Sequence, residues 1–495
     1  MISNLGEVVP RDAPGNHAWL IEVPVSGPDR IVTYGQLHEQ ADAVAAGLRR
    51  RRFERGASIG LLAINSARYL IAYFGIMRAG MVPVPVSIKL PVETIHHIHR
   101  DASIVLMLVD AEGSARAQGP ASLRIDDDSE WSGLLDSSPA ESAGMRAEEF
   151  ATILYTSGST GRPKGVPLTH GGYLWTIDQL ASSGPPMEGK RVLVAAPLFH
   201  MNALVVSILA ARCGSTVVLM QRFSGAEYLK AAARLHCHVL TSVPTMLALA
   251  ARETALVQSL DMSHVETIFT GSAPSTDALF DRVARMFPNA RVMNGYGTTE
   301  AGPVVFGAHP QGLARPKLSL GYPVPGLEWR LEDGPDPMQG VLCLRSKALM
   351  PGYLNLPEET GKRIRDGWYS TGDVMRRDEN GFFFFVGRND DMFVCGGENI
   401  YPGEVEKLLE THPSVAQAVV VPVPDEIKGQ LPVAFVVIKP GAELTEEEVK
   451  QHALLHAAAY QHPRQVTFLD EMPLAGTNKV DRGQLIERAT RSFRR

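Results

Sequence analysis

The sequence predicts an α/β protein. We expect a large N-terminal domain of helix-covered, mostly parallel sheets with a β-rich subdomain, followed by a small, mobile α+β domain. The length of 495 residues exceeds the roughly 100 to 200 residues of a typical domain. Apolar strand-like runs alternate with helix-length intervals up to about residue 310. Beyond it the segments are shorter and are punctuated by Gly and Pro, which favours a β-rich region.

The first elements follow the strand–helix–strand order of a parallel sheet. Thr33 matches the first position of a capping box, and apolar residues at helical spacing extend the expected helix to about Arg52. Residues 59–64 and 82–86 are expected strands, with an expected helix at residues 66–80 between them. Because parallel neighbours need a long crossover connection, this order predicts a helix-covered sheet.

The middle of the chain continues this pattern after one irregular stretch. Residues 111–147 lose periodicity and gain Gly, Ser and acidic residues, which predicts a long surface connection. The α/β pattern then resumes. Further strands are expected at residues 151–155, 191–196, 215–220 and 238–243.

The C-terminal part has the pattern of a separate compact unit. Residues 415–423 and 431–439 are apolar strand candidates, and a helix is expected from Thr445. The change in pattern lies near Asp390. We therefore expect two domains, at residues 1–389 and 390–495.

The composition favours small-molecule partners over nucleic acid or a membrane. A formal net charge of −6 and a pI near 6.2 provide no basic field for a phosphate backbone. No apolar run reaches the roughly 20 residues that span a bilayer, and the first residues lack the pattern of a signal peptide. The four cysteines are scattered without metal-binding or disulfide spacing, so we expect a cytoplasmic protein.

The stretch TSGSTGRPKG, residues 156–165, directly follows an expected strand and predicts a phosphate-binding loop. Glycines let the backbone approach a polyanion, hydroxyl groups donate to phosphate oxygens, and Lys164 adds a cation. It is not a Walker A loop, because Lys164 lies between Pro163 and Gly165. A flexible turn is the alternative. The expected phosphate contacts are Thr156, Ser157, Gly158, Ser159, Thr160 and Lys164.

Five further motifs follow this loop along the chain. They are NGYGTTE (294–300), YSTGD (369–373), GRNDD (387–391), GGENIYP (396–402) and PLAGTNKVDR (473–482). Each is moderately specific, but the ordered set resembles the adenylate-forming superfamily of acyl-CoA synthetases, adenylation domains of peptide synthetases and luciferases. The resemblance extends from Thr33 to Arg482.

The resemblance implies that these motifs hold ATP and then AMP. Tyr296 offers a flat face for adenine, and Asn294 has an amide that reads its exocyclic amine. A turn aromatic that covers the core is the alternative for Tyr296. Asp373 accepts the ribose hydroxyls, and Arg388 resembles the family arginine that reaches the same sugar. The other expected nucleotide contacts are Gly271, Ser272, Ala273, Pro274, Gly295, Gly297, Thr298, Thr299 and Lys479.

Glu300 and Thr156 are the expected contacts of Mg²⁺, which prefers oxygen ligands; a solvated carboxylate is the alternative for Glu300. In the family, the lysine equivalent to Lys479 comes from the small domain and bonds the α-phosphate and the attacking carboxylate. It would stabilise the adenylation transition state, and an exposed lysine is the alternative. Asn478 stands where the family usually has Gly, and Asn tolerates a left-handed backbone. The expected catalytic residues are Lys479, Glu300, Thr156 and His200.

Asp390 matches the hinge position of the family motif. The resemblance implies that the small domain rotates after adenylation and withdraws Lys479. The same rotation would bring the hairpin motif to the site, where Gly396, Gly397 and Glu398 form the expected coenzyme A (CoA) tunnel.

His200 and Asn202 lie near the expected acyl pocket. His200 would gate the pocket or bond the carboxylate, and a packed core histidine is the alternative. Their segment lacks an aspartate to pair with an amino acid's ammonium group, which disfavours amino-acid activation. Bulky Met293 beside these polar groups favours a small acid, hydroxylated or aryl, over a long fatty chain. The other expected pocket walls are Val205, Val243, Pro244 and Val304.

We therefore expect an ATP-dependent acid–CoA ligase that forms an acyl-adenylate, releases pyrophosphate and AMP, and uses ATP, Mg²⁺ and CoA. One alternative is an adenylating enzyme that loads a separate acyl carrier protein. Another is a nucleotide-binding regulator without catalysis. The presence of Lys479, Glu300 and the phosphate loop argues against the regulator.

Overall fold

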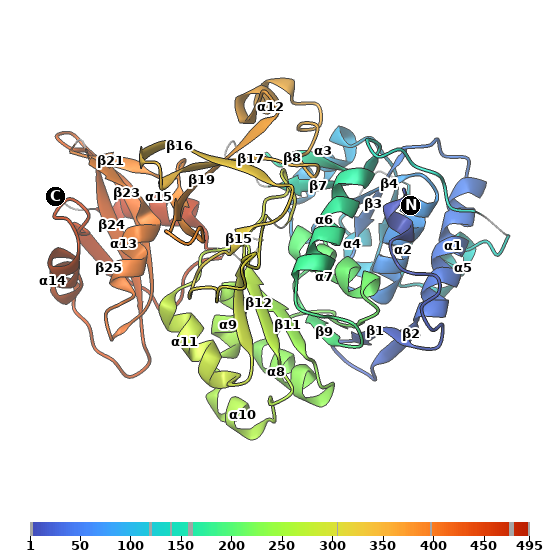
Figure 1. The fold of residues 1–495 in the computed structure, drawn as a ribbon, viewed down its shortest axis with the longest axis horizontal. Coiled ribbons are helices and arrows are strands. Elements are labelled where there is room, and N and C mark those ends of the chain that lie inside the picture. Colours follow the sequence, from blue (N-terminus) through green and yellow to red (C-terminus); the bar gives the residue numbers. More distant parts are fainter. Residues whose placement is uncertain are drawn as a thin grey trace.

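A computed structural model describes residues 3–117, 121–138, 141–156, 162–303, 305–396, 398–474 and 480–493, with the backbone alone at Pro335 and Asn399. Figure 1 shows the N-terminal α/β layers at the right of the view and the C-terminal elements at the left, with the β-rich region between them. None of the helices in these residues is long and apolar enough to cross a bilayer.

The largest sheet has seven strands in the order β13-β12-β11-β9-β10-β1-β2. All neighbours are parallel except β1 and β2, which confirms the mostly parallel prediction. Because β12 and β13 run in the same direction, Gly271 pairs with Gly295 at their carboxyl ends. The strands are β1 (Ala18–Val23), β2 (Arg30–Thr33), β9 (Arg191–Val194), β10 (Thr216–Met220), β11 (Val239–Ser242), β12 (Thr267–Gly271) and β13 (Arg291–Gly295).

A second, four-stranded sheet is entirely parallel, in the order β4-β3-β5-β6. Thr33 forms the predicted capping box with Gln36, and the helix that follows ends at Arg50, two residues before the predicted end. This helix packs on the next one through a shared apolar core. The elements are β3 (Ser58–Leu62), β4 (Val82–Pro85), β5 (Ile104–Val109), α1 (Tyr34–Arg50), α2 (Ala67–Arg78) and α3 (Val92–Asp101).

The strand predicted at residues 151–155 lies outside both parallel sheets. It is β7 (Phe150–Thr156), which pairs antiparallel with β8 (Lys164–Thr169). The register places Thr156 opposite Lys164, so two predicted phosphate contacts face each other across this pair. The large domain also contains η1 (Leu5–Glu7), α6 (His170–Ser183), α7 (Met201–Arg212), α8 (Gly225–Arg234), α9 (Pro244–Ala250), α10 (Thr254–Ser259) and α11 (Asp277–Met286).

The prediction of an irregular connection over residues 111–147 was wrong in part. Short elements lie there: α4 (Ala111–Ser114), β6 (Ser122–Arg124) and α5 (Asp128–Leu134). The Asp127 side chain caps α5, and Trp131 buries one face of it. Elements of three to seven residues are too short to show a periodic apolar pattern.

The predicted β-rich region is confirmed after residue 305. Strands β16, β17, β19 and β18 form an antiparallel sheet, and β20 pairs with β19. Phe306 stacks on Phe383 with ring centroids 4.8 Å apart in the core of this region. The elements are β14 (Phe306–Gly307), β15 (Tyr322–Pro323), β16 (Glu328–Asp336), β17 (Gln339–Arg345), α12 (Pro357–Arg363), β18 (Ile364–Arg365), β19 (Trp368–Arg377) and β20 (Phe383–Arg388).

The C-terminal elements form another sheet, in the order β22-β21-β24-β23, with β25 parallel to β24. Its buried residues form a core cluster of their own, and Thr445 forms a capping box at the predicted helix start. The domain division at residues 389 and 390 stays a prediction. The elements are β21 (Phe393–Cys395), β22 (Glu398–Ile400), α13 (Pro402–Leu409), β23 (Val415–Asp425), β24 (Gly429–Ile438), α14 (Glu446–His456), β25 (Gln465–Phe468) and α15 (Arg482–Ser492).

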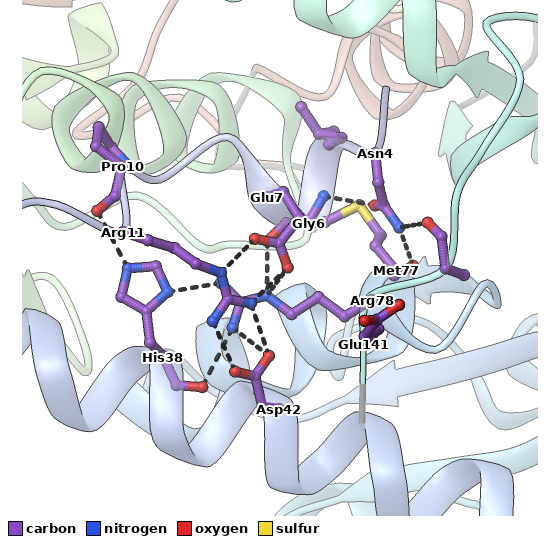
Figure 2. A network of polar contacts seen from close by, with 12 residues as sticks. Asn4, Gly6, Glu7, Pro10, Arg11, His38, Asp42, Met77, Arg78 and Glu141 are labelled. Atoms are coloured by element: carbon purple, nitrogen blue, oxygen red, sulfur yellow. Dashed lines mark hydrogen bonds and ion pairs between the residues drawn. The ribbon is translucent and has the colours of Figure 1, made fainter. Parts of the chain in front are cut away.

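A buried arginine joins η1, α1 and α2 (Figure 2). The side chain of Arg78 is fully buried and donates to the Gly6 carbonyl oxygen at 2.9 Å and to Asp42 Oδ1 at 2.9 Å. Glu7 lies 3.1 Å from the Arg78 Nε, and Arg11 bonds both carboxylates from outside. Two cations and two carboxylates therefore neutralise one another in this cluster.

Candidate active site

One cavity of about 1300 Å³ lies between the β-rich region, the edge of the large sheet and the C-terminal domain. The predicted nucleotide motifs converge on it from separate parts of the chain. The predicted site residues that line it are Thr156, Lys164, Pro244, Ser272, Ala273, Pro274, Asn294, Gly295, Tyr296, Gly297, Thr298, Thr299, Glu300, Asp373, Arg388 and Asp390.

The predicted phosphate end of the cavity contains Thr156 and Lys164, at the facing ends of β7 and β8. The predicted contacts between these two, Ser157, Gly158, Ser159 and Thr160, lie outside the described residues. Lys164 is 8% exposed, and its Nζ lies 2.5 Å from Glu359 Oε2 on α12. The hydrogen bonds from Lys164 and Lys362 lower the pKa of Glu359 to about 2, so this carboxylate is charged at neutral pH.

Glu300 lies beside this end and is held by one segment of the β-rich region. The Tyr353 hydroxyl donates to Glu300 Oε1 at 3.0 Å, and the Met350 amide donates to the Glu300 carbonyl oxygen at 2.7 Å. The Lys164 Nζ also lies 5.2 Å from the centre of the Tyr353 ring. The Glu300 carboxylate and the Thr156 hydroxyl are hard oxygen ligands on the cavity wall, which fits Mg²⁺ carried by nucleotide phosphates.

The predicted adenine contacts lie at the carboxyl ends of β12 and β13 and in the turns that follow. The Asn294 Nδ2 donates to the Leu318 carbonyl oxygen at 3.1 Å, which orients the amide. Tyr296 lines the cavity and also packs against Phe306, at 5.8 Å between ring centroids. It therefore takes part in the core as well as in the cavity wall. Ser272, the first residue after β12, also lines the cavity and has a φ of 65°.

The predicted ribose contact is a buried carboxylate with two partners in the cavity. Asp373 is 5% exposed and pairs with Arg388 across β19 and β20, with Arg388 Nη1 at 3.0 Å from Asp373 Oδ1. The Tyr296 hydroxyl donates to Asp373 Oδ2 at 2.5 Å. Burial and the charge of Asp373 raise the pKa of Tyr296 well above its ordinary value, so the hydroxyl keeps its proton and acts as a donor.

The predicted hinge residue belongs to the same charged group. Asp390 Oδ2 accepts from Arg363 of α12 at 2.8 Å and from Arg388 at 3.3 Å. Burial would raise the pKa of Asp390, but the hydrogen bond and charge of Arg363 and the charge of Arg388 lower it overall. Asp390 is therefore anchored to the β-rich region in this arrangement.

The C-terminal domain closes one wall of the cavity. The Lys407 Nζ of α13 donates to the Phe385 carbonyl oxygen of β20 at 2.8 Å. Leu474 and Val480 pair as an isolated β-bridge and both line the cavity. Lys479 lies outside the described residues, within the segment that these two residues enclose.

Within the described part of the chain, several predicted acyl-pocket residues do not line this cavity: His200, Asn202, Val205, Val243 and Met293. Asn202 nevertheless contacts the cavity wall, because its Nδ2 donates to Ser272 Oγ at 3.3 Å. Val205 is 3% exposed and belongs to the main core. The His200 ring packs on Phe199 at 4.5 Å between centroids. Val304 lies outside the described residues.

The predicted CoA-tunnel residues Gly396 and Glu398 lie on the β21–β22 hairpin and are not among the described lining residues. Gly396 has a φ of 63°, which glycine adopts without strain. Gly397 lies outside the described residues. In this arrangement Leu474 and Val480, rather than the described residues of the hairpin, border the cavity.

Sequence reasoning missed Tyr353, Arg363 and Lys407, which line the cavity, and Glu359, which pairs with Lys164. Each acts through a partner distant in sequence, as with Lys164 and Glu359, which are 195 positions apart. A single sequence carries no signal for such pairs.

A family model described as AMP-binding enzyme matches residues 10–354, and one described as AMP-binding enzyme C-terminal domain matches residues 404–479. Feruloyl-CoA synthase of an Amycolatopsis species is 32% identical over 468 residues, covering 92% of this chain and 94% of the relative. 4-Coumarate–CoA ligase 1 of Petroselinum crispum is 31% identical over 482 residues, covering 92% and 88%. The solved structure of the anthranilate CoA ligase AuaEII in complex with anthranoyl-AMP is 25% identical, with a TM-score of 0.90 over 99% of this chain and 98% of that one.

Proposed function

Because the chain belongs to the AMP-binding enzyme family, we propose that it activates an aromatic carboxylic acid with ATP and transfers the acyl group to CoA. It is an AMP-forming acid–CoA ligase, like the relatives to which it is similar over nine-tenths of its length. The observation that carries the proposal is the convergence of Thr156, Glu300, Asp373 and Arg388 on one cavity.

In the first half-reaction the acid's carboxylate attacks the α-phosphorus of ATP, and the bond to the leaving pyrophosphate breaks. Asp373 would hold the ribose, and Lys164 would neutralise phosphate charge. Glu300 and Thr156 would hold the Mg²⁺ that supplies charge neutralisation at the phosphates. Lys479 would stabilise the charge that develops between carboxylate and α-phosphate.

In the second half-reaction the CoA sulfur attacks the acyl carbonyl carbon, and AMP leaves with the electron pair of the broken C–O bond. We propose that residues 390–495 rotate about Asp390 between the two steps. The exchange would replace the Lys479 segment with Gly396, Gly397 and Glu398. The position of this hairpin away from the cavity supports an arrangement suited to the first step.

The aromatic nature of the substrate is argued from two observations. Feruloyl-CoA synthase, 4-coumarate–CoA ligase and the anthranilate ligase are all named for aromatic acids. The cavity wall from α9 includes the apolar side chains of Pro244, Ala248 and Leu249, which suit the face of a ring. His200 and Asn202 would select polar ring substituents. The free thiols of all four cysteines fit the reducing cytoplasm, where we place the reaction.

The test is a panel of acids assayed with MgATP and CoA, measuring pyrophosphate release and thioester formation separately. Cinnamic, benzoic and hydroxybenzoic acids should be turned over, and a long-chain fatty acid should not. Lys479→Ala should slow acyl-adenylate formation about 10²- to 10³-fold, as expected for the loss of one preorganised donor, while CoA capture of preformed acyl-adenylate persists. Preference for the fatty acid would contradict the substrate class, and equal loss in both steps would contradict the domain exchange.

A further inference from the structure

The segment from Met350 to Arg363, called here the connector, touches three parts of the predicted site. It includes α12, which lies at the top of the view in Figure 1. At its first residues the connector holds Glu300, through the Met350 amide and the Tyr353 hydroxyl. Tyr353 is fixed in turn, because its own amide donates to Thr360 Oγ1 at 2.9 Å.

The same segment holds the phosphate end of the cavity. The Leu354 amide donates to the Gly165 carbonyl oxygen at 2.8 Å, next to Lys164. Glu359 accepts from the Lys164 Nζ at 2.5 Å with its Oε2, and from Lys362 at 2.5 Å with its Oε1. The connector therefore neutralises the cation of the predicted phosphate loop.

The far end of the connector holds the predicted hinge. Arg363 donates to Asp390 Oδ2 at 2.8 Å, and the hydrogen bond to Asp390 raises the pKa of Arg363, offsetting the effect of burial. Glu359 and Arg363 stand four positions apart in α12, so they lie on one face of the same helix. One helical turn thus separates the ion pair at the phosphate end from the ion pair at the hinge.

We propose that the connector couples occupancy of the phosphate site to the hinge, with Glu359 as the residue that competes with phosphate for Lys164 and Arg363 as the residue that passes the change to Asp390. Both are positioning residues. The inference rests on the proposed function, because it assumes that Lys164 binds nucleotide phosphates.

The competition follows from the charges. A phosphate group that takes the Lys164 ammonium leaves Glu359 with Lys362 as its neighbouring cation, and that side chain is 66% exposed. The ion pair between Lys164 of β8 and Glu359 of α12 is then lost. The hydrogen bond from Arg363 to Asp390 weakens as a result. When pyrophosphate leaves, Lys164 returns to Glu359 and the ion pair between β8 and α12 re-forms. A change in one ion pair is thereby transmitted along a rigid element that has two alternative sets of partners.

The first experiment measures binding of magnesium pyrophosphate by calorimetry, without acid or CoA. Glu359→Gln removes the competing charge and should tighten binding about three- to fivefold, the effect of one partly exposed ion pair. Glu358→Gln is the matched control, because it removes the same charge from an exposed neighbour on α12 and should leave the affinity unchanged. Unchanged or weaker binding in Glu359→Gln would overturn the competition.

The second experiment follows amide hydrogen exchange of residues 388–393 with and without pyrophosphate. Pyrophosphate is the probe because it has the phosphate groups that would take Lys164 but no ribose for the Asp373–Arg388 pair to bind. In the wild-type protein it should speed exchange at the hinge. Arg363→Met should still bind pyrophosphate but lose this response, and Arg363→Lys should restore part of it. Arg365→Met, which removes an exposed arginine without an ion pair among the described residues, should respond like the wild type.

A hinge response that persists in Arg363→Met, or that is absent in the wild type, would overturn the coupling. These measurements need no acyl transfer. If pyrophosphate changes exchange at the hinge but the protein forms no acyl-CoA, the proposed function is wrong and the coupling through the connector stands. If the protein forms acyl-CoA but the hinge does not respond, the coupling is wrong and the proposed function stands.

Discussion

Two networks of ion pairs in this molecule are made of the same kinds of side chain but differ in how readily their contacts can be exchanged. The Arg78 cluster lies within one domain and joins η1, α1 and α2 (Figure 2). The cavity network runs through Asp373, Arg388, Asp390 and Arg363 and faces a space of about 1300 Å³. Their difference lies in burial and in the number of partners each cation has within the protein.

The Arg78 guanidinium is fully buried, and it bonds the Gly6 and His38 carbonyl oxygens as well as two carboxylates. Burial would raise the pKa of Glu7, but the hydrogen bond from Arg11 and the charge of Arg78 lower it overall. The Arg78 guanidinium cannot exchange these contacts for others, because water and ligands do not reach it. The residues of this cluster therefore keep a single set of contacts.

In the cavity network, the side chains of Arg388 and Asp390 are 41% and 42% exposed. Solvent screens these pairs, so each contributes little to stability and is easily exchanged for a ligand contact. Under the proposed rotation about Asp390 this network releases its partners, and partial exposure makes that release possible. The comparison indicates that burial, rather than the choice of residues, separates a permanent ion pair from an exchangeable one.

Arg78→Met tests the permanent network and should give the largest effect. Removing the buried cation takes the donor from the Gly6 and His38 carbonyl oxygens and leaves the exposed Arg11 as the cation for both carboxylates, so the free energy of unfolding should fall by about 3–5 kcal/mol. Denaturant unfolding measures it. Arg50→Met is the control, because Arg50 is 55% exposed in its pair with Asp136, and it should cost under about 1 kcal/mol. Equal effects of the two variants would remove burial as the deciding factor.

Asp373→Asn tests the exchangeable network. The loss of two charge-assisted bonds to ribose should lower kcat/KM for ATP about 100-fold, at about 1.5 kcal/mol or more for each bond. Stability should change little, since the freed Arg388 is exposed to solvent. Discrimination against 2′-deoxy-ATP should shrink as well. Asp366→Asn, at an exposed turn with a φ of 51° that Asn tolerates, should match the wild type in both assays.

Glu410→Gln examines a third arrangement, a buried carboxylate without an ion pair among the described residues. Glu410 Oε1 accepts from the Ala418 amide at 3.1 Å, while Oε2 is buried without a partner there. Burial raises the pKa of Glu410 to about 8, against the lowering effect of the Ala418 amide, and neighbouring Glu406 adds to the rise. The folded state therefore binds the proton more tightly than the unfolded state.

The stabilisation from this proton is complete below the ordinary pKa of 4.5 and is lost as the pH rises through about 8. Denaturant midpoints should accordingly fall between about pH 5 and pH 8 in the wild type. Glu410→Gln should flatten this fall and add about 1–3 kcal/mol at pH 9, the desolvation cost of an unsatisfied charged group. Glu426→Gln, in the β23–β24 turn, should keep the wild-type slope. A slope unchanged by Glu410→Gln would assign the pH dependence to other groups.

Sequence reasoning succeeded where local chemistry decides the structure. The capping box at Thr33 and the helix start at Thr445 were predicted because each depends on residues close in sequence, and the alternating strands and helices follow from apolar spacing. It failed to pair β7 with β8 and to find the elements within residues 111–147. Strand partners are chosen by contacts distant in sequence, and short elements are stabilised by burial such as that of Trp131.

The candidate site shows the same division. The motifs predicted which residues line the cavity, because Gly-rich and acidic patterns carry their chemistry in consecutive positions. The ion pairs that hold these residues were not predictable. Glu359 stands in an ordinary acidic helix start, and Arg78 stands in the last turn of a helix, where a solvated cation is the usual outcome. Folding places the first against Lys164 and the second in the core.

Tyr296→Phe asks how much one contact contributes to the exchangeable network, and it should give the smallest effect. The variant keeps the ring against Phe306 but removes the hydroxyl that donates to Asp373 Oδ2. Asp373 would still be held by Arg388, so kcat/KM for ATP should fall about fivefold, equivalent to about 1 kcal/mol for one hydrogen bond. Tyr322→Phe, outside the cavity, is the control. A loss as large as that of Asp373→Asn would mean that the hydroxyl alone orients the carboxylate, and the network would then be as interdependent as the Arg78 cluster.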